Sequence, residues 1–138
     1  MQHLLSEHAL EQLGLATVSI SAPSGFGGSY WNPGEYALVK VRVTNSTGVP
    51  LRDVVASLRV TGRASVAPFP FLPGLYDAEG YWKELEPGQS EVYWVRLRAS
   101  SNMEGGTVTM RASVCADIVP YVCRDLASRT AAVQQAYV

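Results

Sequence analysis

Hydrophobic residues recur with a period of two in several segments of this chain, and this alternation constrains the fold more than any other feature. Small or charged residues occupy the intervening positions, as Lys40 and Arg42 do between three valines. Such alternation is typical of antiparallel strands with one buried and one solvated face. The side chains predicted to point inward are Val39, Val41, Val43, Val54, Ala56, Leu58, Val60, Tyr93, Val95, Leu97, Val108, Met110, Ala112 and Val114.

Turn signals separate these segments. Asn32-Pro33-Gly34 and Glu86-Pro87-Gly88 place proline and glycine where a type II turn requires a fixed φ followed by a positive φ. Asn45-Ser46-Thr47 ends one strand and also matches the N-glycosylation acceptor, and the turn interpretation is favoured. Weaker alternation at 15–21 and 129–138 adds further strands. Residues 15–138 are therefore expected to form a single all-β domain, an immunoglobulin-like antiparallel β-sandwich or a Greek-key barrel.

Residues 1–14 differ from the rest because their apolar side chains follow a helical spacing. They predict a short N-terminal helix or arm that ends at Gly14. A helix of this length is marginal alone in water, so its leucines must pack on one end of the same sandwich or on a neighbouring subunit. We predict that the arm contributes to assembly more than to folding, through the partner-interface residues Leu4, Leu5, Leu10 and Leu13.

Cys115 and Cys123 are the two cysteines of the chain and lie close together in sequence. An oxidised pair would close a hairpin-sized loop and stabilise the fold by about 2–3 kcal/mol in the chain-entropy model. The alternative is two free thiols in the core. A metal site is not expected, because the only histidines, His3 and His8, lie far away in sequence. We predict the disulfide.

The segment from Pro68 to Trp82 combines prolines with aromatic side chains. Proline at this density is incompatible with a central strand, so the aromatic residues are predicted to lie on a loop. The loop is interpreted as a lid on the core, a partner interface or a platform for sugar rings. We predict the partner interface, which also includes Trp94 because strand parity places it on the outward arginine face. Its residues are Phe69, Phe71, Leu75, Tyr76, Trp82 and Trp94.

Charge and motif content argue against several classes of function. The formal net charge of −1 provides no broad attraction for nucleic acid, so no nucleic-acid partner is expected. No apolar run approaches the roughly 20 residues that cross a bilayer, and the N-terminus lacks the features of a secretion signal. Membrane insertion is not expected, and assembly rather than export would bring the chain to its location. We predict no catalytic residues, no metal and no cofactor, since both histidines lie on the terminal arm.

Three segments follow one another in a recognisable order. Asn32-Pro33-Gly34-Glu35 precedes a strand that ends in Thr44-Asn45-Ser46-Thr47-Gly48, and Leu85-Glu86-Pro87-Gly88-Gln89-Ser90 precedes another strand. This pattern resembles the CARDB-like immunoglobulin-fold modules of prokaryotic surface proteins, over roughly Asn32 to Val114. The resemblance implies an immunoglobulin-like fold on a surface. Its motifs are turn motifs and therefore specify the fold better than the function.

Together these observations predict a non-catalytic structural protein of a surface assembly. The most specific expectation is a virion capsid decoration protein, located on the virion surface, which self-associates and binds a host particle. The alternative is a carbohydrate- or protein-binding adhesive module at a prokaryotic cell surface, or an extracellular filament subunit. The predicted disulfide and the excess of arginine over lysine favour a thermophilic source.

Overall fold

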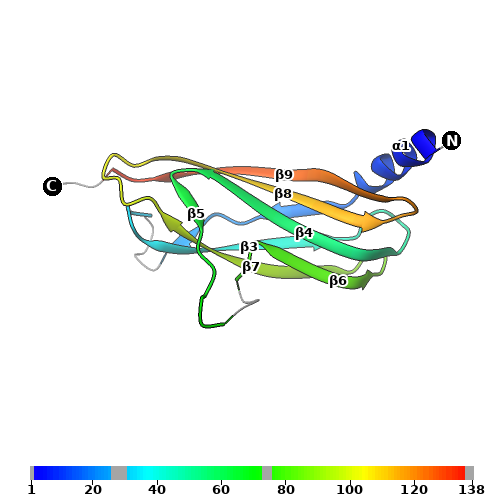
Figure 1. Ribbon diagram of the computed structural model, residues 1–138, viewed down its shortest axis with the longest axis horizontal. Coiled ribbons are helices and arrows are strands. Elements are labelled where there is room, and N and C mark those ends of the chain that lie inside the picture. Colours follow the sequence, from blue (N-terminus) through cyan, green and yellow to red (C-terminus); the bar gives the residue numbers. More distant parts are fainter. Residues whose placement is uncertain (1, 26–30, 73–75, 136–138) are drawn as a thin grey trace.

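The structure is a computed structural model that describes residues 2–25, 31–72 and 76–135. A helix at one end precedes a series of strands (Figure 1). The elements are α1 (Gln2–Leu13), β1 (Thr17–Ile20), β2 (Ser24–Gly25), β3 (Tyr36–Thr44), β4 (Leu51–Gly62), β5 (Ala64–Val66), β6 (Glu79–Leu85), β7 (Ser90–Ala99), β8 (Gly106–Asp117) and β9 (Tyr121–Val133).

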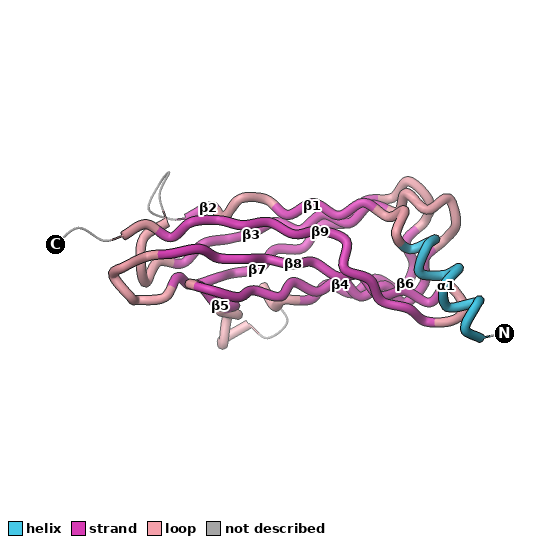
Figure 2. Tube along the Cα trace, turned by 90° about the horizontal axis from the view of Figure 1, so that it is seen from above, coloured by secondary structure: helices cyan, strands magenta, loops and turns pink. Residues whose placement is uncertain are grey.

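The strands form two antiparallel sheets that pack face to face (Figures 1 and 2). One sheet, sheet A, has the order β1-β3-β7-β5, with β2 also paired to β3; the other, sheet B, has the order β6-β4-β8-β9. The chain changes sheet at every connection from β3 to β8, which is the crossing pattern of a sandwich. The prediction of an immunoglobulin-like β-sandwich is confirmed, and the described strands do not form the alternative, a Greek-key barrel.

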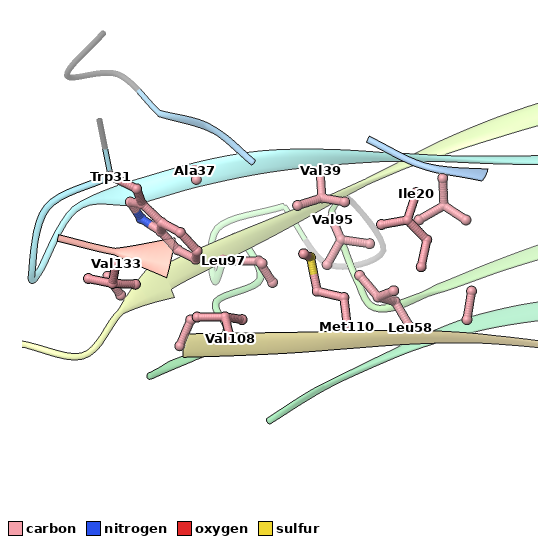
Figure 3. Packing of buried hydrophobic residues seen from close by; sticks show 14 residues of the cluster. Ile20, Trp31, Ala37, Val39, Leu58, Val95, Leu97, Val108, Met110 and Val133 are labelled. Carbon is pink, nitrogen blue, oxygen red and sulfur yellow. The ribbon is translucent and has the colours of Figure 1, made fainter. Parts of the chain in front are cut away.

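The predicted inward side chains meet between the two sheets. Val39 and Val95 from sheet A face Leu58 and Met110 from sheet B (Figure 3). The strand register keeps these faces aligned, because Val39 lies directly opposite Val95 and Leu58 opposite Ala112. All of the predicted inward residues are buried except Val60 and Tyr93, which are half-buried and pack against the core.

Both predicted type II turns are confirmed. Gly34 has a φ of 80°, and the Glu35 amide donates to the Asn32 carbonyl over 3.1 Å. Gly88 has a φ of 83°, and the Gln89 amide donates to the Glu86 carbonyl over 2.9 Å. Each glycine occupies the position where a side chain would be strained.

Helix α1 lies at the end of the sandwich opposite the end at which β9 finishes (Figures 1 and 2). Ala9 and Leu13 belong to a second buried cluster with residues of both sheets, among them Val43 and Val114. Arg124 of β9 donates to the Leu10 carbonyl over 2.8 Å, where a cation complements the carbonyl end of a helix. A Cβ on Gly14 would lie 2.6 Å from Nη1 of Arg124, so Gly14 leaves room for this contact.

Two predicted boundaries are wrong. The sequence predicts a loop as far as Trp82, whereas the structure has strand β6 from Glu79 onward. The first half of β9 was also not predicted as a strand, although the tail does close an edge of sheet B through Val133. Both strands lie at sheet edges, where few side chains are buried, so their hydrophobic alternation is weak.

Candidate functional site

The residues predicted to form a partner interface do not gather into one site. Leu13 is fully buried in the chain's own core, Leu10 is half-buried against it, and Leu5 is 55% exposed. The self-packing alternative thus holds for Leu10 and Leu13. Of the other predicted residues, Leu75 and the side chain of Leu4 lie outside the described part of the structure, and the rest divide among the β5–β6 connection, β6 and β7.

Arg96 of β7 holds the connection between β5 and β6 against sheet A. Its guanidinium carbon lies 4.1 Å from the centroid of the Phe69 ring and 4.4 Å from that of Tyr36. The same guanidinium donates from Nε to the Ala67 carbonyl over 2.6 Å and from Nη2 to the Pro68 carbonyl over 3.3 Å. These contacts fix the start of the loop, because the Arg96 guanidinium makes both the cation–π contact with Phe69 and the hydrogen bonds to the loop backbone.

The tip of this loop presents apolar side chains to solvent. Phe71 is 86% exposed and Leu72 is 52% exposed. Phe69 is half-buried and its ring centroid lies 5.8 Å from that of Tyr76, which is also half-buried. The loop borders an open groove of about 710 Å³ whose lining includes Val66, Pro68 and Tyr81. Phe69 and Tyr76 therefore support the loop, while Phe71 remains free to contact a partner.

Trp82 lies on strand β6, not on the predicted loop. Its ring centroid is 6.0 Å from that of Tyr93 on the other sheet, and it is half-buried against the second cluster. Gly80 makes this packing possible, because a Cβ there would lie 2.7 Å from the Trp82 ring and 3.0 Å from the Tyr93 ring. Trp82 thus contributes to packing between the sheets in the structure.

Trp94 points outward from β7, as strand parity predicts, and is 44% exposed. It lies directly opposite Lys40 of β3, whose Nζ is 5.9 Å from the ring centroid. Arg96 and Arg98 share its face, and Arg98 lies 5.2 Å from the Tyr36 centroid. This face therefore combines an accessible indole ring with several cations.

Cys115 and Cys123 form the predicted disulfide. They are direct partners in the register of β8 and β9, with their Cα atoms 3.9 Å apart. Both lie on the outward face of sheet B, so the alternative of two free core thiols is wrong. The connection that the disulfide closes includes Val119, which is 80% exposed.

Asn45 shows why the glycosylation motif is a turn. Its side chain is fully buried, and Nδ2 donates to the carbonyls of Val49 and Leu85 over 2.8 and 2.7 Å. Its Oδ1 accepts from the Thr47 amide and hydroxyl. Both amide hydrogens are used inside the fold, so Nδ2 of the folded chain is not accessible for a glycan.

Tyr81, Glu86 and Tyr93 have raised pKa values. A hydrogen bond over 3.1 Å to Asp53 raises the pKa of Tyr81, and the neighbouring Glu84 raises the pKa of Glu86. Burial raises the pKa of Tyr93. The described residues contain no group of three or more His, Cys, Asp or Glu side chains that could hold a metal ion, and no helix long and apolar enough to cross a membrane.

Sequence reasoning did not identify Arg96, Tyr36 and Lys40 as parts of a candidate site. Their outward parity was visible, because each alternates with residues predicted to point inward. The contact between Arg96 and Phe69, and the pairing of Lys40 with Trp94, depend on the β5–β6 connection and on the register of β3 with β7. The alternation of inward and outward residues along a single strand does not show which residues of other strands or loops lie beside them.

Comparison with known proteins supports the fold. No protein-family model matches the sequence, and no curated protein matches it. A fragment of native alpha-2-macroglobulin from Escherichia coli, from domain MG7 to the C-terminus, matches 86% of this chain with a TM-score of 0.63 and 15% identity. The chain spans only 16% of that fragment. The ApaA protein from Bordetella pertussis matches 88% of this chain and 95% of its own, with a TM-score of 0.54 and 15% identity.

A CARDB domain from Pyrococcus furiosus matches 72% of this chain and 73% of its own, with a TM-score of 0.48 and 17% identity. That similarity is too low to assign the chain to the CARDB modules, so the specific resemblance stays a prediction. The macroglobulin fragment and the ApaA protein, with TM-scores above 0.5, support the fold alone, and at 15% identity they indicate no function for the chain.

Proposed function

We propose that the chain is a non-catalytic structural module of a surface assembly, and that it binds a protein partner through the β5–β6 loop. The observation that carries this proposal is Phe71, 86% exposed on a loop whose start is fixed to β7 by Arg96. An aromatic side chain close to a segment that is already held in place loses less conformational entropy when a partner covers it. The adjoining groove gives a partner further surface to contact.

The finer form of this proposal is a decoration protein on a virion capsid. The disulfide between Cys115 and Cys123 supports an oxidising setting outside the cytosol or on a particle surface. A particle lattice would offer the same partner surface to many copies of the chain, and contacts between neighbouring copies would produce the expected self-association. Attachment to a prokaryotic cell surface uses the same loop and is the competing outcome.

The location is tested by immunogold electron microscopy with antibodies against the chain, applied to virions and to cells of the same culture. Regular labelling of the capsid exterior supports the virion form of the proposal. Labelling confined to the cell envelope contradicts the virion form and supports attachment to a prokaryotic cell surface.

The contact is tested by cosedimentation with particles or envelopes stripped of the chain. Phe71→Ser is expected to weaken binding about 30-fold, because truncation of an aromatic anchor costs about 2 kcal/mol or more. Val119→Ser is the matched control, since Val119 is 80% exposed on the separate β8–β9 connection. Binding reduced equally by both variants, or by neither, would show that the β5–β6 loop is not the specific contact.

A further inference from the structure

The outward face of β3 and β7 carries one cation on each of four consecutive cross-strand pairs. We name this row the cation ladder; its pairs are Tyr36–Arg98, Leu38–Arg96, Lys40–Trp94 and Arg42–Val92. Successive outward pairs in a sheet lie about 7 Å apart, so the four cations extend over about 20 Å. The neighbouring inward residues, Ala37, Val39 and Val41 among them, are fully buried, which confirms the orientation of the row.

No acidic residue occupies an outward position in the described strands of sheet A. The remaining outward positions in the described strands of sheet A are Thr17, Ser19, Ser24, Thr44, Ser65 and Ser90. The ion pair found within 4.0 Å in the described residues joins Arg63 to Glu104, so none of the ladder cations is paired with a carboxylate there. This face carries four of the eleven lysine and arginine residues of the chain, whose net charge is −1.

The outward face of sheet B has a different charge pattern. Arg52 lies opposite Asp117 on one side and Glu84 on the other, so its charge has acidic neighbours across both strands. Arg59 and Arg111 lie opposite each other and are both exposed. The two exposed arginines of sheet B are therefore not part of a continuous row of cations. Variants of this pair can serve as a control for variants of the cation ladder.

Trp94 is the ring of the ladder that a ligand can cover. It is 44% exposed, and the nearest cation over its ring, Lys40 Nζ, is 5.9 Å from the centroid, whereas the Arg96 guanidinium lies only 4.4 Å from the centroid of Tyr36. Lys40 lies beside Trp94, and Arg42 follows on the next outward pair. Short hydroxyl side chains flank these cations, with Ser19 directly opposite Arg42 on β1.

We propose that the cation ladder binds an acidic polysaccharide. Lys40 and Arg42 contact its carboxylate or sulfate groups, the Trp94 indole packs against the apolar face of a sugar ring, and the flanking hydroxyls bond to sugar hydroxyls. Single-stranded nucleic acid fits less well, because its bases require a series of free aromatic rings and the ladder presents one. This site is separate from the exposed tip of the β5–β6 loop and goes beyond the proposed protein contact.

Binding is measured by titration calorimetry at several salt concentrations, with dextran sulfate and polygalacturonate as probes. Neutral dextran and oligo(dT) are the comparison ligands. The wild-type chain is expected to bind at least one acidic polysaccharide and not neutral dextran. Binding of dextran sulfate identifies sulfate as an accepted group, and binding of polygalacturonate identifies carboxylate.

The charge variant is Lys40→Gln with Arg42→Gln, and its matched control is Arg59→Gln with Arg111→Gln on sheet B. Losing two ionic contacts should weaken binding about tenfold and reduce the slope of log affinity against log salt by about two. The control should leave both values unchanged. Trp94→Ala should weaken binding without changing the salt slope, and Trp94→Tyr should retain most of the affinity. Single Arg42→Gln and Arg59→Gln variants repeat the comparison if a double variant does not fold.

Absence of binding to both acidic polysaccharides overturns the proposal, as does an equal loss in the ladder and sheet B variants. Tighter binding of oligo(dT) also overturns it and assigns the face to single-stranded nucleic acid. None of these outcomes depends on Phe71, so this test and that of the protein contact can fail separately.

Discussion

At the scale of single residues, the ring of Tyr93 stabilises the fold by packing, whereas its buried hydroxyl lowers the stability. The ring lies on the inward side of β7, opposite Val41, and packs on Trp82. The hydroxyl is buried and has no hydrogen-bond partner within the described residues. Burial is the main reason why its pKa is raised above the usual range, and the Glu79 carboxylate adds to the effect.

Tyr93→Phe is therefore expected to raise the free energy of unfolding by about 1 kcal/mol at neutral pH, because it keeps the ring and removes an unsatisfied polar group. The variant should also change the response to alkali. The folded pKa of Tyr93 is raised, so the wild type loses stability as the pH rises above the unfolded value of about 10, by about 1.4 kcal/mol per pH unit.

Tyr93→Phe lacks this loss, so the difference between the two proteins should widen above about pH 10. Urea denaturation at a series of pH values measures both effects. A variant that is less stable than the wild type at neutral pH would show that the hydroxyl has a favourable interaction.

At the scale of elements, α1 joins the sandwich through one face and leaves part of another exposed. Leu13 has no exposed surface and belongs to the cluster that includes Val43 and Val114. Leu5 lies two turns earlier in α1 and is 55% exposed. The helix therefore contributes to the core at its C-terminal end, whereas an assembly role depends on its exposed N-terminal part.

Leu13→Ala is expected to lower the free energy of unfolding by about 3 kcal/mol, because it leaves a cavity in a packed cluster. Leu5→Ala should change it by less than about 0.5 kcal/mol, since exposed substitutions rarely do more. If α1 takes part in assembly, Leu5→Ala should lower the native mass measured by sedimentation at high protein concentration. Unchanged stability in Leu13→Ala would show that α1 is not part of the fold.

At the scale of the whole molecule, the two sheets carry different features on their outward faces. The cation ladder and the Arg96-held loop belong to sheet A, and the disulfide lies on the outward face of sheet B. The core between the sheets separates these surfaces, so a change to one should leave the other folded. The disulfide joins adjacent strands and does not link the two sheets.

Replacement of both Cys115 and Cys123 by serine is expected to lower the free energy of unfolding by about 2–3 kcal/mol, in the chain-entropy model for a short loop. The fold should persist, because the core between the sheets does not include the disulfide. Thermal unfolding measures the loss, and intact mass with and without reductant verifies the bond in the wild type. Two free thiols in protein isolated without reductant would contradict the disulfide.

The sequence alone predicted an all-β fold, either a sandwich or a Greek-key barrel, together with the inward face of four central strands and the two proline–glycine turns. These features depend on local chemistry: a period of two follows from the pleat, and a positive φ selects glycine at Gly34 and Gly88. The pairing of Cys115 with Cys123 was also predictable, because their spacing fits one hairpin.

The tertiary structure decided where the candidate sites lie. Trp82 lies on edge strand β6 and packs against Tyr93, and Leu13 is buried in the core. The register of β3 with β7 places Lys40 beside Trp94. Arg96 contacts Phe69 because β5 pairs with β7, so that the β5–β6 connection begins beside Arg96. The residues of each contact are far apart in sequence, so the contact depends on how strands pair and sheets pack, which the local hydrophobic pattern does not encode.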